Sequence, residues 1–266
     1  MPAATSTTPS FSAGVVAASL AVLVVFLAAW EWLPPLAKIP EFILPPPSRV
    51  WSEFLRMQAN ERLLHHTGIT ALEVVVGFVL GSLLGVIIGF ILGVAPRVEL
   101  VLSPYILALQ IAPKVAFAPL FVMWLGFTVY PKILVAILIV FFPVMVNVLT
   151  AIRTVDPDMV NLARSFSATR LQIFRMIEYP ATMAPLFSGL RIAATLAVIG
   201  VVVGELVGGN LGLGYLLVMG EGQGNTAMVF VTIILLTVIG IAAYGAVVWA
   251  EGRVLHYMPR AQHTTV

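Results

Sequence analysis

The polar residues that could take part in chemistry stand singly within long apolar stretches. They are Glu73, Gln110, Lys114, Asn147, Arg191 and Glu205. No apolar stretch carries paired carboxylates, a Ser–His constellation or metal-ligand spacing, so the sequence predicts neither an enzyme nor a metal site. A polar side chain in such a stretch is expected to face protein or a water-filled path rather than lipid.

Each of these positions has more than one interpretation. Gln110 and Asn147 could bind a solute or hold a neighbouring helix. Arg191 could pair with a carboxylate or attract an anion. Glu205, near the outer end of its stretch, could bind there or extend to the interface. Lys114 lies between Pro113 and Pro119. These prolines predict a broken helix, and broken helices often form the solute sites of membrane transporters.

The composition predicts the class of protein. Hydrophobic residues make up 60% and charged residues 10% of the 266 residues, and the mean hydropathy is +1.05. These values predict an all-α polytopic membrane protein that is embedded in a lipid bilayer. The formal net charge of +2 does not favour nucleic-acid binding, and the absence of cysteine excludes disulfides and thiolate sites.

The sequence predicts six transmembrane helices, since a helix needs roughly 20 apolar residues to cross the hydrocarbon core. The candidate spans cover approximately 14–33, 70–94, 99–125, 132–152, 181–206 and 227–250. The first could instead be a signal peptide, but no Lys or Arg precedes Lys38, so the positive region of such a peptide is missing. We expect residues 1–266 to form a single membrane domain.

Basic residues near the span ends predict the orientation. If both termini are inside, the cytoplasmic segments hold Arg97, Arg153, Arg164, Arg170, Arg175, Arg253 and Arg260. The outer segments then hold Lys38, Arg49, Arg56, Arg62 and Lys132. The larger number, and its concentration in residues 153–180, places that loop and both termini in the cytoplasm.

The outer segment 34–68 is rich in proline and then becomes amphipathic. Residues 45–47 are three prolines, which favour extended backbone, and Ser48 is predicted to cap the short helix that follows. This helix could lie in the membrane interface or pack over the bundle. His65 and His66 are adjacent and point to different sides of a helix, so they do not predict a metal site.

Glycine recurs at every fourth position in the predicted span 70–94 and again in residues 181–214. The two series are Gly77, Gly81, Gly85, Gly89 and Gly93, and Gly200, Gly204, Gly208 and Gly212. Such stripes of small residues let another helix approach backbone to backbone. The sequence therefore predicts close helix packing, within one chain or between two copies.

The loop 153–180 is predicted to form a pair of short helices. Asp156 can cap a helix that starts at Pro157 and runs to about residue 166. Thr169 and Gln172 make a capping box for a second helix, which is expected to end before Pro180. A simple connection between two spans needs about five residues, so a folded loop of this length indicates a docking surface.

At these residues the chain resembles the membrane subunits of bacterial ATP-binding-cassette importers. Their signature is Glu-Ala-Ala, three residues, Gly, nine residues and Ile-x-Leu-Pro, and its spacing is intact here. Ala163, Ile177 and Pro180 match it, whereas Asn161, Leu162, Ser167 and Tyr179 replace the expected residues. Segments 113–120, 124–126, 189–193 and 212–216 are similar to the nitrate, sulfonate and taurine branch, which includes thiamine- and riboflavin-precursor permeases.

The resemblance implies a permease subunit in the bacterial inner membrane, with the loop 153–180 as its coupling-helix loop. It implies a homodimer with two ATPase subunits and an extracytoplasmic solute-binding protein. The residues implied to contact the ATPase are Asn161, Leu162, Ala163 and Arg164, with Ser167, Ala168 and Thr169 at the turn. This chain has no Gly-Lys dipeptide and therefore no phosphate-binding Walker loop, so ATP and Mg²⁺ would bind the partner and no cofactor is expected here.

A secondary transporter or channel that needs no ATPase is the main alternative. The absence of an evident inverted repeat and the small number of ionisable residues in the spans oppose it. A membrane protein with no transport role is a further alternative, which co-purification of an ATPase would exclude. The resemblance does not distinguish nitrate, alkanesulfonates, taurine and vitamin precursors as the solute.

Overall fold

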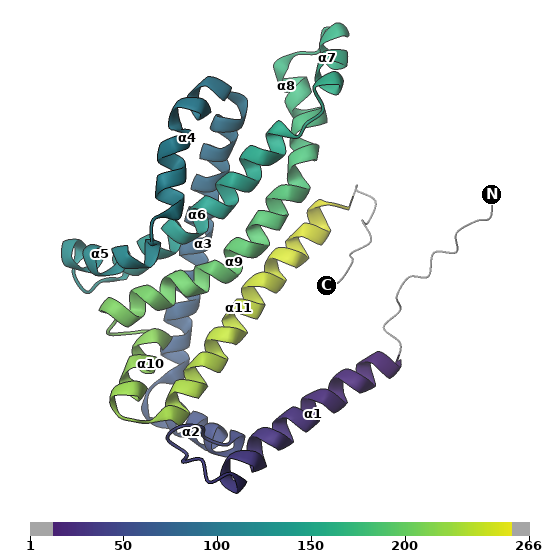
Figure 1. Cartoon of the computed structure of the whole chain (residues 1–266). Coiled ribbons are helices and arrows are strands. Elements are labelled where there is room, and N and C mark those ends of the chain that lie inside the picture. Colours follow the sequence, from purple (N-terminus) through teal and green to yellow (C-terminus); the bar gives the residue numbers. More distant parts are fainter. Residues whose placement is uncertain (1–12, 257–266) are drawn as a thin grey trace. The chain divides into compact units, whose positions relative to one another are not determined.

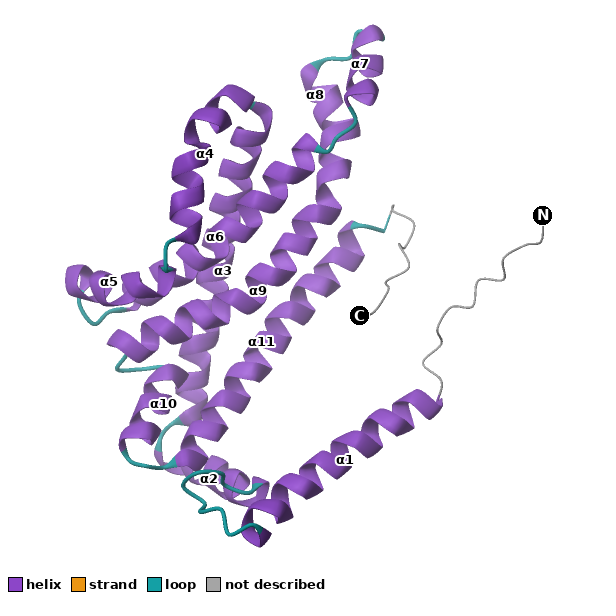
Figure 2. Ribbon diagram, viewed as in Figure 1, coloured by secondary structure: helices purple, strands orange, loops and turns teal. Residues whose placement is uncertain are grey.

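A computed structural model describes residues 13–256, which are helical with no strand in that range (Figure 2). The helices are α1 (Ala13–Leu36), α2 (Pro47–Asn60), α3 (Leu63–Val94), α4 (Pro96–Ile111), α5 (Ala118–Leu125), α6 (Val129–Arg153), α7 (Pro157–Ser165), α8 (Arg170–Ile173), α9 (Tyr179–Gly208), α10 (Leu213–Gly222) and α11 (Thr226–Val254). A 3₁₀ turn, η1 (Lys114–Phe117), precedes α5, and a π-helix, η2 (Phe174–Glu178), precedes α9.

The lengths and composition of these helices confirm a multi-pass all-α membrane protein. Within the described range, α1, α3, α6, the continuous segment Arg170–Gly208 and α11 are each long and apolar enough to cross a membrane. The helices on the two sides of Pro113 are bent by 80° and provide a sixth span if they are counted together. A broken helix is therefore present at Lys114, where the flanking prolines predict one. The predicted termini and Arg260 lie outside the described residues.

The described chain falls into two compact units. Unit 1 comprises residues 13–62 and 219–231, and unit 2 comprises residues 63–218 and 232–256. Helices α10 and α11 contribute residues to both units. Figure 1 shows α7 and α8 at one end of unit 2 and the start of α10 at the other end.

Unit 2 is built on α3, α6 and α9, which pack along their lengths. Glycine makes this possible: a Cβ atom added at Gly204 of α9 would lie 2.6 Å from the Cα atom of Lys132 on α6. A Cβ atom at Gly81 of α3 would lie 2.8 Å from a side-chain methyl of Val140. The predicted close packing is confirmed, and it occurs within one chain. Buried small and branched residues fill the same interfaces: Val135, Ala136, Val140, Ala193, Ala197 and Val201.

Unit 1 contains one correction to the sequence prediction. Helix α2 begins at Pro47, so Ser48 lies inside its first turn instead of capping it from outside. One free amide of that turn is satisfied from α1, because the backbone N–H of Ser48 donates to Glu31 at 3.0 Å and its hydroxyl donates to the same carboxylate at 2.6 Å. A proline can start a helix itself, since its fixed φ suits the first turn and it has no N–H to satisfy.

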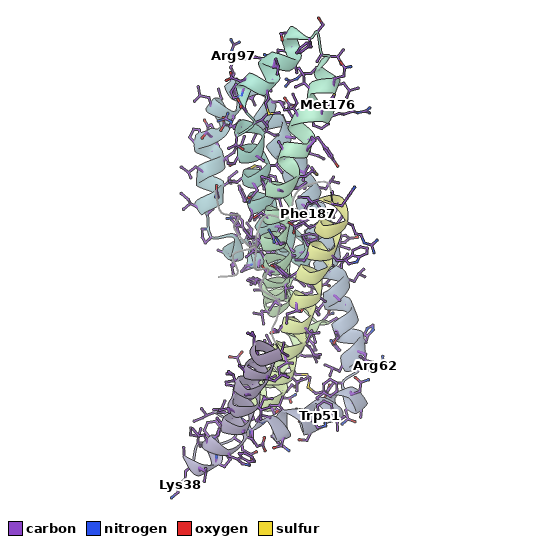
Figure 3. All side chains as sticks on the ribbon, turned by 90° about the vertical axis from the view of Figure 1, so that its right-hand side faces the viewer. Lys38, Trp51, Arg62, Arg97, Met176 and Phe187 are labelled. Carbon is purple, nitrogen blue, oxygen red and sulfur yellow. The ribbon has the colours of Figure 1, made fainter. Side chains whose placement is uncertain are left out.

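The inner face of α2 carries a buried carboxylate. Glu53 accepts hydrogen bonds from the guanidinium of Arg56 and from the amide of Asn225 at 2.8 Å. The bond from Arg56 is the largest cause of a lowered pKa for Glu53, which burial opposes. On the outer side Trp51 is exposed and stacks on Phe54 at 5.3 Å, as expected for an interfacial helix (Figure 3).

Candidate functional site

The loop between α6 and α9 folds as a helix, a turn and a second helix. The carboxylate of Asp156 accepts the N–H of Asp158 at 2.8 Å, which caps α7 as predicted. Helix α7 ends in a turn in which Ser167 has φ +60° and its N–H donates to the carbonyl of Arg164. This left-handed conformation suits glycine and small polar residues best, which gives a physical reason for a small residue at this position.

The predicted capping box is present at the start of α8. The backbone N–H of Thr169 donates to the side-chain oxygen of Gln172 at 2.7 Å. The N–H of Gln172 in turn donates to the hydroxyl of Thr169 at 3.4 Å. The two bonds fix the direction in which the chain leaves the turn.

The expected helix end before Pro180 is wrong. From Arg170 to Gly208 the chain is continuously helical, passing through the π-helix η2 and into α9. In this π segment the N–H of Tyr179 donates to the carbonyl of Phe174, five residues earlier. A wider turn accommodates a proline, because Pro180 has no N–H and its ring would collide with a carbonyl of a regular helix. The loop therefore continues into α9 as one continuous helix.

The surface of α7 is apolar and exposed. Relative exposure is 54% for Met159, 61% for Leu162 and 81% for Phe166, while Ala163 is partly covered. Met176, in η2, is exposed at the same end of unit 2 in the side view of Figure 3. The described residues therefore leave more than half of each of these four exposed side chains uncovered.

The charges of the loop are only partly paired. Arg170 forms an ion pair with Glu178 at 3.4 Å, and Arg153 forms one with Glu99 of α4. Among the described residues Arg164 is in no ion pair. The loop therefore presents an apolar helix with a free positive charge beside it.

A cavity of about 450 Å³ lies beside the break between α4 and α5. Its lining includes Gln110, Lys114 and Asn147 together with Phe142 and Pro143 of α6. Three candidate residues from separate parts of the sequence are therefore brought together here. Pro113 is the residue before η1 and sets the bend that directs Lys114 toward α6.

Arg191 and Glu205 do not line this cavity. The Nε atom of Arg191 is 3.5 Å from a carboxylate oxygen of Glu251 on α11, so the ion-pair interpretation of Arg191 is correct. Glu205 is only 1% exposed, which contradicts its extension to the interface. The chain after α9 turns back at this point and covers the carboxylate.

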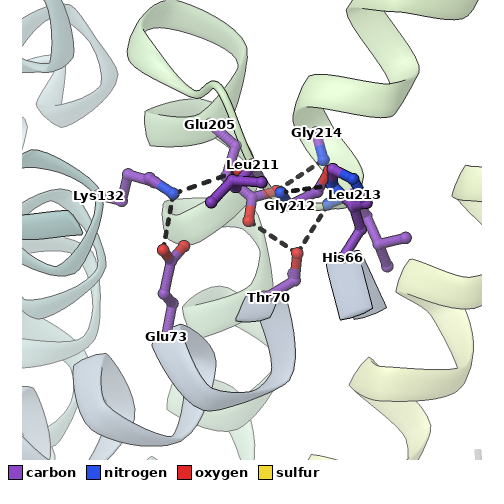
Figure 4. Close-up of polar contacts among 9 residues, drawn as sticks. All are labelled: His66, Thr70, Glu73, Lys132, Glu205, Leu211, Gly212, Leu213 and Gly214. Atoms are coloured by element: carbon purple, nitrogen blue, oxygen red, sulfur yellow. Dashed lines mark hydrogen bonds and ion pairs between the residues drawn. The ribbon is translucent and has the colours of Figure 1, made fainter. Parts of the chain in front are cut away.

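Glu205 holds the start of α10 against α3. Its carboxylate accepts the Thr70 hydroxyl at 2.7 Å and the backbone N–H of Gly214 at 2.6 Å (Figure 4). The Thr70 hydroxyl accepts the N–H of Leu213 at 2.8 Å. Two otherwise free amides at the beginning of α10 are thus satisfied by side chains of α3 and α9.

The same network continues through an ion pair between α3 and α6. The Nζ atom of Lys132 donates to Glu73 at 2.6 Å and to the carbonyl of Leu211 at 3.3 Å (Figure 4). Glu73 and Lys132 are 2% and 4% exposed. The sequence predicts Lys132 in an outer segment, which is wrong: it lies inside the bundle, where Gly204 of α9 leaves room for its stem.

His66 completes this end of unit 2. Its Nδ1 atom accepts the backbone N–H of Gly212 at 3.0 Å, and its ring stacks on Tyr215 at a centroid distance of 5.9 Å. Gly212 has φ +110°, and a Cβ atom there would collide with Glu205. Position 212 therefore requires glycine for two reasons: its backbone is left-handed, and it lies against the carboxylate of Glu205.

A family model described as the binding-protein-dependent transport system inner membrane component matches residues 77–256. The chain belongs to this family of importer permeases. It is 37% identical over 222 residues to the riboflavin transport system permease RibX of Chloroflexus aurantiacus, covering 84% of this chain and 83% of that protein. It is 33% identical over 216 residues to the putative aliphatic sulfonates permease SsuC of Bacillus subtilis, covering 81% and 78%.

A probable ABC transporter permease of Haemophilus influenzae is 33% identical over 230 residues, or 86% of this permease and 93% of that protein. The named relatives include a riboflavin permease and a putative aliphatic sulfonates permease. The permease is therefore a membrane subunit of an ABC importer in the nitrate, sulfonate and taurine branch.

The sequence analysis did not predict that His66, Thr70, Glu73, Lys132 and Glu205 form one hydrogen-bond network in the permease. His66, Thr70 and Glu73 recur at intervals of four and three residues, the spacing of one helix face, and this pattern could have shown that they act together. Their contacts with Lys132 and the turn 209–212 could not be read from spacing. No group of three or more His, Asp or Glu side chains placed to hold a metal occurs in residues 13–256.

Proposed function

We propose that this chain is the permease subunit of an ATP-driven importer and provides the translocation pathway for a small solute. Two copies would form the pathway, two ATPase subunits would bind them from the cytoplasm, and an extracytoplasmic binding protein would deliver the solute. ATP and Mg²⁺ would bind the ATPase subunits. The family and the named relatives support this proposal.

The observation that carries the proposal is the exposed apolar surface of α7. Met159, Leu162 and Phe166 lie on a short helix whose ends are fixed by their own caps, and the described residues leave more than half of each of these side chains uncovered. A groove on an ATPase would bury them, and Arg164 could pair with an acidic residue at the rim of that groove. Asn161, Ala163, Ser167, Ala168 and Thr169 belong to the same helix and turn.

The continuous helix from Arg170 to Gly208 gives this surface a mechanical connection to the bundle. A movement of the loop would be transmitted along α9 to the turn 209–212 at the other end of unit 2, because the segment from Arg170 to Gly208 is continuously helical. ATP binding and solute binding would then bias the same two arrangements of the bundle. This mechanism requires the loop to be cytoplasmic. The basic residues predict this side for the loop and for both chain termini.

The test is co-purification of the ATPase with tagged permease from detergent, followed by an ATPase assay. Leu162→Glu places a charge at the centre of the proposed contact, and Ala163→Glu adds bulk beside it. Both variants are expected to lose the ATPase while the permease remains folded. Leu55→Glu is the matched control, since Leu55 is an exposed residue of α2, and it should retain the ATPase.

Two outcomes would contradict the proposal. Folded wild-type permease that brings no ATPase would favour transport driven by an ion gradient, which uptake measured with a proton or sodium gradient would reveal. Retention of the ATPase by both α7 variants would move the docking surface away from this helix. A basic residue of the loop, Arg175, would then be the next position to substitute.

A further inference from the structure

The cavity beside α5 carries a positive charge that no acidic group balances. Its lining contains the ammonium group of Lys114 and the side-chain amides of Gln110 and Asn147, but no carboxylate. In the described part of the chain no Asp or Glu lies within ion-pair distance of Lys114. This contrasts with Lys132 and Arg191, which both have carboxylate partners.

The contacts of Lys114 fix its position without neutralising it. Its Nζ atom donates to the backbone carbonyl of Gln110 at 2.5 Å and lies 4.8 Å from the ring centroid of Phe142. An ammonium group has three donors, so this arrangement leaves donors for a further partner. Asn147 uses its N–H group on the carbonyl of Pro143 at 2.8 Å, which points to its oxygen as the free group.

Electrostatics determines which solutes such a cavity accepts. Residues of low polarity surround the charge, among them Ile139, Phe142 and Leu196, so the surroundings screen it less than water would. A cationic solute would be repelled. A solute that presents an oxygen acceptor would gain a charge-assisted hydrogen bond, and the aromatic ring would offer an apolar surface beside it.

We infer that this cavity is a water-accessible section of the solute pathway, in which Lys114 receives an oxygen acceptor of the solute and excludes cations. The acceptor is a sulfonate or carboxylate oxygen, or a ring carbonyl of a polar heterocycle. The inference rests on the proposed function and adds the chemical class of the solute. It also assigns Lys114 as the residue that selects this class.

The absence of cysteine in the chain allows a direct measurement of the charge in the cavity. Val146→Cys introduces one thiol into the lining with little change of volume. The purified permease is treated with two methanethiosulfonates of similar size, the anionic sulfonatoethyl reagent and the cationic trimethylammonioethyl reagent. The ratio of the two labelling rates is compared in the presence of Lys114, Lys114→Arg and Lys114→Met, so the intrinsic reactivities of the reagents cancel.

We expect Lys114→Met to lower the ratio of anionic to cationic labelling by about tenfold, the effect of one charge acting over several ångström in a partly screened site. Lys114→Arg keeps the charge and should leave the ratio nearly unchanged. An equal ratio in all three proteins would overturn the inference. So would failure of both reagents to label a thiol that reacts after unfolding, because the cavity would then be closed to water.

Leu196→Cys, a second lining position, provides the same measurement if Val146→Cys does not fold. The labelling needs no ATPase, so its failure and the failure of the importer proposal are separate results. Protection from labelling then distinguishes the acceptor. Protection by millimolar taurine or ethanesulfonate indicates an oxyanion and protection by riboflavin a ring carbonyl, whereas protection by choline alone, or by none of them, would overturn the solute contact.

Discussion

The buried ion pair between Glu73 and Lys132 leads to a quantitative prediction. One oxygen of Glu73 accepts the lysine at 2.6 Å, and the other, Oε2, has no hydrogen-bond partner among the described residues. Lys132→Met would therefore leave a carboxylate that is 2% exposed with neither oxygen paired. It would also remove the donor to the carbonyl of Leu211, while the apolar stem of the side chain would keep its volume.

The expected loss of stability is about 3 to 5 kcal/mol, the cost of leaving one partner of a buried ion pair uncompensated. Coulomb's law gives a similar figure, since two charges about 4 Å apart at an effective dielectric constant of 20 attract by about 4 kcal/mol. Replacing both residues, as Glu73→Leu with Lys132→Met, removes the unpaired charge. The double variant should therefore recover most of the loss of the single variant.

The measurement is thermal unfolding of the purified permease in detergent, followed by tryptophan fluorescence at one scan rate because unfolding of such proteins is often irreversible. At roughly 2 to 4 °C per kcal/mol, Lys132→Met should lower the apparent Tm by about 6 to 20 °C. A single variant that melts within about 2 °C of wild type, or a double variant that is no more stable than the single one, would refute this account of the pair.

Three further predictions follow from the packing, the loop and the pKa. Gly204→Ala should destabilise the permease by about 1 to 3 kcal/mol in the same thermal assay because its Cβ atom meets the backbone of α6, while Gly245→Ala, with open space around it, should have little effect. Ser167→Gly should keep or slow amide hydrogen exchange in the turn and Ser167→Val should speed it, since φ +60° costs a β-branched residue about 1 to 2 kcal/mol. The lowered pKa of Glu53 contributes stability above the unfolded-state value of about 4.3 and loses it as the pH falls through the lower folded-state value. When the pH is lowered from about 6 to about 3.5, the apparent Tm of Glu53→Gln should therefore fall less than that of the wild-type permease. An equal fall in both proteins would exclude this role for the bond from Arg56.

The local structure of the loop was largely predictable from its residues. The cap at Asp156, the capping box of Thr169 and the turn at Ser167 each depend on neighbours within a few positions, and all three are present. The end before Pro180 was wrong, because a proline ends a regular helix but not one that widens into a π turn. Whether the chain makes that turn depends on packing around Phe174, which contacts the rings of Phe90 and Tyr179.

The sequence by itself determined that this is a multi-pass helical protein with five or six apolar spans, and where glycine allows helices to meet. These properties depend on the apolar length of each segment and on the absence of a side chain, so they need no knowledge of partners. The resemblance to importer permeases came from the spacing of the loop together with the segments 113–120, 124–126, 189–193 and 212–216. The solute and the assembled partners were not, because related permeases with different named solutes share these motifs.

Only the tertiary structure decided what each isolated polar residue does. Gln110, Lys114 and Asn147 meet at one cavity, whereas Glu205 binds the turn after α9 and Arg191 binds α11. The sequence could show that each must avoid lipid, since burying an unpaired polar group is costly. It could not show which partner would satisfy each one, because these contacts join positions up to 135 residues apart and arise only when the helices pack.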